Sequence, residues 1–262
     1  MILTCDDFGI HRDIDSSIIS LCENNKVNAV SVISCGKTFL SSIKELYKFK
    51  EKVNIGIHST WVGEQSILPY QKIPSIVTKE KYFCNDFKTF YFKWLIGKID
   101  LDHLMAELEE QVLRLLNIVG HIDHIDSHQH IHMIPKIFYR CIMLAEKYNI
   151  PRIRVTDEYF SSRLPTIFNP IKVSGEKIIK SWAIKNRNIV ESSLVETTEN
   201  FFGLRYSGNF NLINNYLIKL LKEKKQDIEI NFHPAFKTDS LLADYPWYQN
   251  GDFDYNILLK NN

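Results

Sequence analysis

Short runs rich in β-branched and aliphatic residues alternate with amphipathic segments along most of this chain. The runs that are typical of strands cover residues 2–5, 29–34, 53–57, 122–125, 152–155 and 227–232. The segments between them repeat apolar residues at helical spacing and include residues 14–21, 40–47, 102–116, 137–148 and 210–221. Strands separated by helices pair in parallel, and so long a series favours a barrel over a small open sheet. The sequence therefore predicts an α/β fold, a (β/α) barrel or partial barrel.

Length and composition favour a single domain covering residues 1–262. A chain of 262 residues with 45% hydrophobic content can bury one substantial core and lies near the size at which single cores stop growing. The 32 basic residues nearly balance the 31 acidic ones, so no net field would attract nucleic acid or anionic lipid, and we expect a neutral substrate. The five cysteines are scattered without a C-x-x-C pair, which predicts reduced thiols rather than disulfides or a cysteine-rich zinc site.

The apolar runs predict a cytoplasmic protein without a membrane span. Asp6 and Asp7 follow Met1 too closely for the apolar region of a signal peptide to form. The most apolar run, residues 90–96, is far shorter than the ~20 residues needed to cross a bilayer and is interrupted by Lys93.

Acidic and histidine residues follow several of the expected strands. Asp6 and Asp7 come after the first strand, His58 after the third and His233 after the last, and the segment D-S-H-Q-H-I-H occupies residues 126–132. In parallel barrels the reacting groups lie where strands end and the next loops begin. A carboxylate with two imidazoles at such an edge suits Zn²⁺ or another divalent cation, which activates water for hydrolysis.

Each of these residues also has a purely structural explanation. A single histidine is more often hydrogen-bonded within the fold than bound to a metal, although this explains one histidine better than the whole group. Asp6 and Asp7 could instead cap the helix that follows. In an extended strand the two aspartates point to opposite sides, so both reach one site only if the chain turns at once, which Gly9 permits.

Five short motifs follow one another along the chain. They are T-C-D-D-F-G at residues 4–9, G-I-H at 56–58, H-I-D-S-H-Q-H-I-H at 124–132, R-I-R-V at 152–155 and N-F-H-P-A-F at 231–236. In order and spacing they resemble the motifs of the YdjC-like carbohydrate deacetylases, and the resemblance covers nearly the whole chain. The nine-residue histidine motif is specific, whereas G-I-H alone carries no weight. Residues 247–262 agree least with the family.

The resemblance implies a barrel-like fold related to NodB-type polysaccharide deacetylases and removal of an acetyl group from an N-acetylated sugar. It implies one divalent metal ion, Mg²⁺ or Zn²⁺, held by Asp7, His58 and His128. It further implies that Asp6 is the base that takes a proton from water and that His233 is the acid that protonates the leaving amine. Members of this family are expected to pair as homodimers.

Three more residues are expected beside the metal or the substrate, namely Arg154, His130 and His132. By resemblance, Arg154 would orient Asp6. In an extended segment the histidines at 128, 130 and 132 would share one side at a spacing of ~6.6 Å, too far apart for all three to reach one ion at ~2.1 Å. His128 is nearest the strand end, which together with the resemblance makes it the expected ligand.

Two long stretches, residues 59–97 and 156–199, show little periodicity and are too long for simple connections. We expect them to shape the substrate cleft. Trp61 lies in the first of them, where it could stack on a sugar ring or pack in the core, and it is not assigned to the site.

Two other functions fit part of the pattern. A metal-dependent phosphoesterase could use a similar His/Asp cluster, but it should offer cationic groups for the phosphate, and beside the motifs only Arg154 and His11-Arg12 occur. A carbohydrate-binding barrel without catalysis would need neither the base Asp6 nor the acid His233. A metal-dependent deacetylase is therefore the favoured interpretation.

Overall fold

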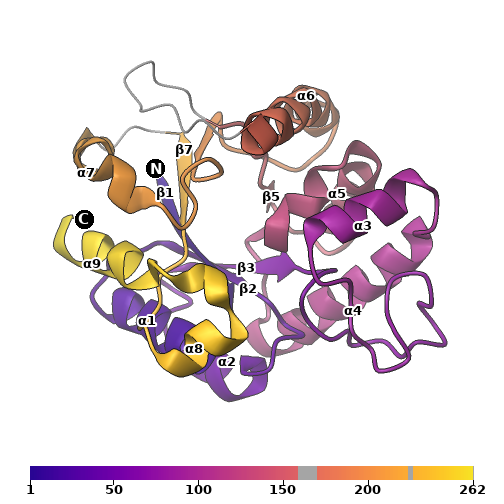
Figure 1. The fold of residues 1–262 in the computed structure, drawn as a ribbon, viewed down its shortest axis with the longest axis horizontal. Helices are drawn as coiled ribbons and strands as arrows, with labels where there is room; N and C mark the ends of the chain where they lie inside the picture. The colour runs from indigo at the N-terminus through magenta and orange to yellow at the C-terminus, as the bar shows by residue number, and fades with distance from the viewer. Residues whose placement is uncertain (159–169, 224–226, 262) are drawn as a thin grey trace.

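The structure is a computed structural model that describes residues 1–158, 170–223 and 227–261, without the side chains of 170–176 and 261 (Figure 1). Its centre is a seven-stranded sheet in the order β5-β4-β3-β2-β1-β7-β6, with every pair of neighbours parallel. The strands are β1 (Ile2–Phe8), β2 (Ala29–Val32), β3 (Asn54–Ser59), β4 (His124–Ser127), β5 (Arg152–Ile153), β6 (Asn200–Phe202) and β7 (Ile228–Phe232). The predicted α/β partial barrel is confirmed.

The sheet stops just short of a closed ring. Among the described residues β5 and β6 share no ladder, but Glu158, a few residues beyond β5, makes a parallel bridge with Phe201 of β6. The central strands are buried on both faces, as expected for a parallel sheet that helices cover. Polar side chains at the strand ends therefore converge on one edge of the partial barrel.

Helices surround the sheet in Figure 1. They are α1 (Arg12–Glu23), α2 (Phe39–Tyr47), α3 (Phe87–Leu95), α4 (Leu101–Val119), α5 (Pro135–Lys147), α6 (Pro170–Glu191), α7 (Asn214–Glu223), α8 (Asp239–Asp244) and α9 (Gly251–Asn261). The described residues also form the 3₁₀ helices η1 (His128–Met133), η2 (Phe210–Ile213) and η3 (Pro246–Tyr248). No helix in the described ranges is both long and apolar enough to cross a membrane.

The longest predicted helix, α4, shows how local sequence sets an element's bounds. Asp100 accepts a hydrogen bond from the backbone N–H of Asp102 at its start, and Gly120 ends it in the left-handed conformation with φ 75°. Leu104 and Leu108 belong to the apolar stripe that α4 buries against the sheet, at the spacing seen in the sequence.

The sequence prediction omitted β6, α3, α6, α8 and α9. Helix α6 falls within the stretch 156–199 that was expected to be irregular, and part of that stretch, residues 159–169, lies outside the described residues. Exposed apolar residues such as Ile178 and Ile184 blur the helical pattern of α6. The five cysteines are free thiols, as predicted, and burial raises the pKa of Cys141 to about 12.

Candidate metal centre and active site

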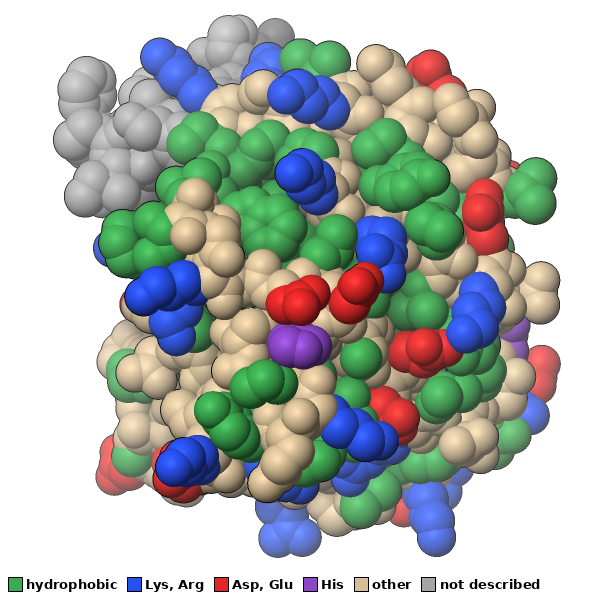
Figure 2. Space-filling model, turned by 90° about the vertical axis from the view of Figure 1, so that its right-hand side faces the viewer, with side chains coloured by type: hydrophobic (Ala, Val, Ile, Leu, Met, Phe, Trp, Pro, Cys, Tyr) green, Lys and Arg blue, Asp and Glu red, His purple; other side chains and the backbone are tan. Residues whose placement is uncertain are grey.

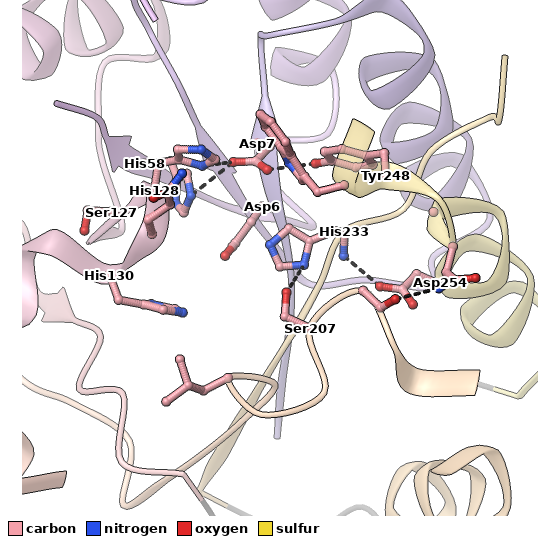
Figure 3. Close-up of a pocket in the computed structure, with 16 residues that line it drawn as sticks. Asp6, Asp7, His58, Ser127, His128, His130, Ser207, His233, Tyr248 and Asp254 are labelled. Atoms are coloured by element: carbon pink, nitrogen blue, oxygen red, sulfur yellow. Dashed lines mark hydrogen bonds and ion pairs between the residues drawn. The ribbon is translucent and has the colours of Figure 1, made fainter. Parts of the chain in front are cut away.

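A pocket of about 380 Å³ opens at the carboxyl ends of the strands (Figure 3). Residues from β1, β3, β4, η1, the loop after β6, the segment just after β7 and the C-terminal segment line it. They are Asp6, Asp7, His58, Ser127, His128, Gln129, His130, Leu204, Ser207, Gly208, His233, Trp247, Tyr248, Asn250, Gly251 and Asp254. Six of the residues predicted from the motifs therefore meet in one pocket: Asp6, Asp7, His58, His128, His130 and His233.

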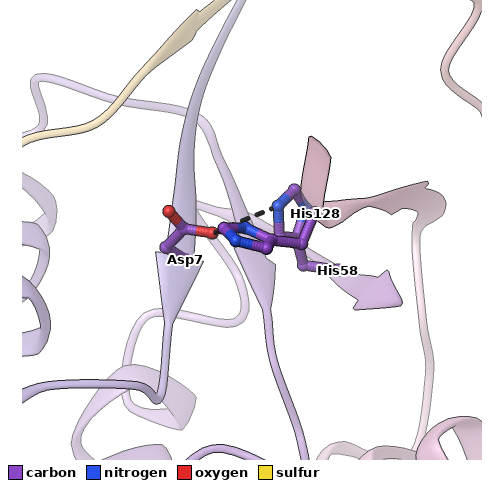
Figure 4. Close-up of side chains that lie close together, drawn as sticks. All are labelled: Asp7, His58 and His128. Atoms are coloured by element: carbon purple, nitrogen blue, oxygen red, sulfur yellow. Dashed lines mark hydrogen bonds and ion pairs between the residues drawn. The ribbon is translucent and has the colours of Figure 1, made fainter. Parts of the chain in front are cut away.

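Asp7, His58 and His128 converge on one point (Figure 4). The Oδ1 atom of Asp7 lies 3.3 Å from Nε2 of His58 and 2.8 Å from Nδ1 of His128. Burial alone would raise the pKa of Asp7, but the His128 and His58 imidazoles outweigh it and hold the pKa well below its usual range. One ionised carboxylate and two imidazoles form a donor set that fits a divalent cation of the Zn²⁺ type.

The backbone turns at Asp7 itself. Asp7 has φ 67°, and the pairing of β1 with β2 shifts register between Cys5 and Phe8. The chain was expected to turn at Gly9, but the bulge comes earlier, and this allows Asp6 and Asp7 to face the same pocket. A non-glycine residue in the left-handed region is strained, and such strain concentrates at functional sites. The helix cap proposed as an alternative for the two aspartates is instead His11.

His58 is fixed from behind by a buried carboxylate. Its Nδ1 donates to Oδ1 of Asp126 at 2.7 Å, and the hydroxyl of Ser31 donates to the other Asp126 oxygen at 2.7 Å. This leaves Nε2 of His58 directed at Asp7. A histidine that binds a metal through one ring nitrogen usually donates the N–H of the other to a carboxylate, as His58 does to Asp126. Burial would lower the pKa of His58, but Asp126 and Asp6 raise it to about 10, so a cation would bind by displacing a proton.

A second group of potential ligands, Asp6, His58 and Asp126, also lies within ligand distance of one another. Its two carboxylates are already neutralised by Arg154, whose guanidinium contacts Asp6 at 2.8 Å and Asp126 at 2.6 Å. A metal ion there would have to displace a buried cation from both partners. The charge balance therefore favours the group of Asp7, His58 and His128.

Asp6 is held ionised beside the group of Asp7, His58 and His128. Arg154 donates to its two carboxylate oxygens at 2.8 and 2.9 Å, and Asn231 donates at 3.2 Å. Burial would raise the pKa of Asp6, but Arg154 and His58 lower it overall. Glu229 accepts from the same guanidinium at 2.8 Å and helps to fix it. The network keeps Asp6 as a carboxylate in one orientation.

His233 lies across the pocket from His58 and His128 in Figure 3. Its Nδ1 is 3.3 Å from the hydroxyl of Ser207, and its backbone N–H donates to Asp254 at 3.0 Å. Burial lowers the pKa of His233, which makes its imidazolium a stronger acid, while the carboxylates of Asp7 and Asp6 act in the opposite direction. The ring therefore faces the same pocket as the group of Asp7, His58 and His128.

A family described as YdjC-like protein matches residues 1–259. The chain belongs to the YdjC-like family. A carbohydrate deacetylase of Thermoanaerobacter pseudethanolicus is 23% identical over 259 residues, which cover 98% of this chain and 90% of the relative. A carbohydrate deacetylase of Clostridium beijerinckii is 24% identical over 246 residues, covering 93% of this chain and 84% of the relative.

A solved structure shares the fold of this YdjC-like chain. It is a protein of Enterococcus faecalis, provisionally named for cellobiose-phosphate cleavage, with a TM-score of 0.73 and 23% identity. The alignment covers 99% of this chain and 90% of that one. At this level of identity the likeness establishes the partial-barrel fold.

The histidine motif of the YdjC-like chain is not extended, contrary to the sequence prediction. Residues 128–133 form η1, in which Gln129 and His130 have φ of 54° and 55°. His132 is fully buried, with hydrogen bonds to the Ser127 hydroxyl at 2.6 Å and to the carbonyl of Arg154 at 3.0 Å, so it supports Arg154 without lining the pocket. His130 lines the pocket, with Nδ1 3.3 Å from the Thr156 hydroxyl.

The described parts of the two long stretches, and Trp61 within the first, lie outside the pocket lining. No residue of 59–97, or of the described part of 156–199, lines the pocket. Trp61 is fully buried and donates to the carbonyl of Leu104, so it packs in the core. The first stretch instead contacts a neighbour of the pocket lining, because Glu64 accepts a hydrogen bond from the Tyr245 hydroxyl at 2.8 Å.

The sequence prediction missed the residues that form the C-terminal wall of the pocket, Trp247, Tyr248, Asn250 and Asp254. The Tyr248 hydroxyl donates to Oδ2 of Asp7 at 2.8 Å, across 241 positions of sequence. Burial and the neighbouring Asp7 raise the pKa of Tyr248 well above its usual value, so the hydroxyl keeps its proton and remains a donor. The aromatic cluster at 245–248 was the available signal, but it lies where the chain resembles the family least.

A separate hollow of about 620 Å³ lies between α3 and α6. Its lining includes Tyr91, Trp94 and Trp182 with Lys136 and Lys185, and no carboxylate or histidine among the described residues. Figure 2 shows the face on the side of α3 and α4, where hydrophobic side chains gather and positive and negative side chains are interspersed. That mixture provides no patch of one charge on this face.

Proposed function

We propose that this protein is a metal-dependent hydrolase that removes the acetyl group from an N-acetylated sugar, such as an oligosaccharide or glycoconjugate containing N-acetylglucosamine. The observation that carries the proposal is the arrangement of Asp7, His58 and His128 beside the ionised Asp6, with His233 across the same pocket. The relatives named carbohydrate deacetylases support the acetylated-sugar substrate.

Asp7, His58 and His128 would hold the cation. A bound divalent cation polarises the acetyl carbonyl and lowers the pKa of water towards ~7. Asp6, fixed by Arg154, takes a proton from the attacking water. The water oxygen joins the acetyl carbon, the carbon–nitrogen bond breaks, and His233 in its imidazolium form gives a proton to the departing amine. Asp6 and His233 then return to their starting states by exchanging protons with solvent. Acetate and the free amino sugar are released.

The proton transfers account for a large part of the expected rate. A positioned general acid or base typically contributes ~10²–10⁴-fold. Asp6 meets the first requirement for a base, since its lowered pKa keeps it unprotonated at neutral pH. Asp6 is shielded from bulk water, since it is 1% exposed, whereas His233 is half-buried in the pocket wall.

The charges of the pocket argue against a phosphoesterase. No lysine or arginine is among the described residues that line it, and three of the lining residues are aspartates. Arg154 is engaged by three carboxylates and is only 1% exposed. Beyond the cation that either reaction would use, a dianionic phosphate would find no cationic side chain to bind it, whereas a neutral acetamido group needs none.

Acetate release tests the proposal directly. Protein stripped of metal by a chelator is incubated with a panel of N-acetylglucosamine oligomers, with and without added Zn²⁺ or Mg²⁺. We expect acetate only after a divalent cation is restored. Full activity in metal-free protein would contradict the proposed mechanism. Hydrolysis of p-nitrophenyl phosphate without acetate release from any oligomer would favour the phosphoesterase.

A further inference from the structure

The segment from Tyr245 to Trp247 places an exposed aromatic ring at the rim of the pocket. Trp247 lines the pocket and is 51% exposed, whereas its neighbours Tyr245 and Tyr248 are 5% and 2% exposed. Other exposed apolar side chains, such as Leu40 and Leu194, lie away from the pocket, and single residues of that kind are ordinary. An exposed tryptophan beside convergent polar groups is typical of a ligand-binding surface.

The Trp247 ring is held in place without a ligand. Tyr245 packs against it edge to face, with ring centroids 5.4 Å apart and planes at 80°. The Tyr245 hydroxyl in turn donates to Oε1 of Glu64 at 2.8 Å, which ties the pair to the stretch 59–97. Such preorganisation lowers the entropy that binding must overcome.

The ring also borders the proposed metal centre. Its centroid lies 6.4 Å from that of the His128 imidazole, with the planes inclined at 44°. A sugar bound at the group of Asp7, His58 and His128 would therefore lie beside the indole. Tryptophan presents a large, flat apolar face, which suits the face of a pyranose ring where C–H bonds project.

We propose that Trp247 is the platform on which a sugar ring of the substrate stacks while its acetamido group enters the metal centre. This inference rests on the proposed deacetylation and adds the recognition element for the sugar. It also defines the substrate class, because a stacked pyranose needs one face free of bulky substituents. Stacking acts equally in the ground state and the transition state, so Trp247 should affect KM rather than kcat.

The test uses Trp247→Ala, Trp247→Phe and the control Trp182→Phe, which alters a tryptophan at the other hollow. Each protein, loaded with Zn²⁺, is titrated with di-N-acetylchitobiose while acetate release and tryptophan fluorescence are followed. We expect Trp247→Ala to raise KM by about tenfold or more with kcat within about threefold, and Trp247→Phe to retain most of the affinity. The fluorescence change should persist in Trp182→Phe and vanish in both Trp247 variants.

The two readouts separate this inference from the proposed function. A KM in Trp247→Ala within twofold of the wild-type value, or a fluorescence change that survives in Trp247→Phe, would overturn the platform. A fluorescence change that depends on Trp247 without any acetate release would support the platform and contradict the deacetylation.

Discussion

The two walls of the pocket hold their side chains in different ways. At the strand ends Asp6, Asp7 and His58 are at most 2% exposed, and each contacts an oppositely charged or hydrogen-bonding partner. The C-terminal wall instead presents Trp247, whose ring is half exposed. Tyr248 connects the walls through its hydrogen bond to Asp7.

We propose that the difference separates reaction from recognition. Charges that stabilise a transition state act best when they are buried and fixed in advance, as those of the strand-end wall are. A surface that recognises a sugar must stay accessible until the sugar arrives. Changes in the strand-end wall should therefore affect metal binding and rate, and a change at Trp247 should affect affinity for the sugar. A change at Tyr248, which contacts Asp7, should weaken the metal centre.

The largest effect is expected within the histidine motif. His128→Ala removes one of the three proposed ligands and should abolish metal binding. His132→Ala should keep the metal with at most a partial loss of activity, because this ring contacts Ser127 and the Arg154 carbonyl instead of the pocket. Elemental analysis of the purified proteins measures both.

Melting temperatures control for folding in this comparison. Removing the fully buried His132 ring should lower stability by about 2–4 kcal/mol through a cavity and lost hydrogen bonds. Metal loss in His132→Ala together with metal retention in His128→Ala would show that the ligand assignment is wrong.

A smaller effect is expected where the two walls meet. Tyr248→Phe removes the hydrogen bond to Oδ2 of Asp7 but preserves the ring, and loss of such an outer partner typically weakens metal affinity by about 10–100-fold. Tyr255→Phe is the matched control, because its hydroxyl contacts Ser20 away from the pocket. Competition with a metal-sensitive dye gives the affinities. Equal affinities in the two variants would mean that Tyr248 does not support the metal centre.

The smallest effect concerns stability and pH. Burial raises the pKa of Asp254 from 3.8 to about 7, so between these values the folded state binds more protons than the unfolded state. Stability conferred by the protonated group is therefore lost as the pH rises through about 7. Asp254→Asn avoids the buried charge and can still accept from the His233 N–H. It should raise the Tm at pH 8 by about 2–4 °C, with less change at pH 5.

Asp239→Asn is the control for this prediction, because Asp239 is exposed on α8 and is not among the charges that shift the pKa of Asp254. Thermal unfolding at both pH values measures the difference. If the gain in Tm is the same at pH 5 and pH 8, it does not arise from the ionisation of Asp254, and the prediction is wrong.

The strand-end wall could be predicted because regular elements determine where its residues lie. Once the strands are recognised, parallel pairing brings Asp7, His58 and His128 to one edge, whatever their separation in sequence. The register within an irregular turn is not fixed in the same way. The bulge at Asp7 and the 3₁₀ turn at η1 were missed because each depends on φ values that the sequence pattern does not reveal.

The C-terminal wall could not be predicted by the same reasoning. Tyr248 and Asp254 reach the pocket through η3 and α9, whose positions depend on packing against distant elements such as α1 and α7. Helix α9 has a weak apolar pattern, so its buried face is not evident from its sequence. The aromatic cluster was visible, but nothing local indicated which ring would be buried and which exposed.

The division of work between the adjacent aspartates is the central claim, and paired measurements on Asp6→Asn and Asp7→Asn test it most directly. Metal content and acetate release from di-N-acetylchitobiose are measured on both proteins. Asp6→Asn should retain the metal and lose about 10²–10⁴-fold in rate, whereas Asp7→Asn should lose the metal. Equal metal loss in both variants, or full activity in Asp6→Asn, would contradict the account.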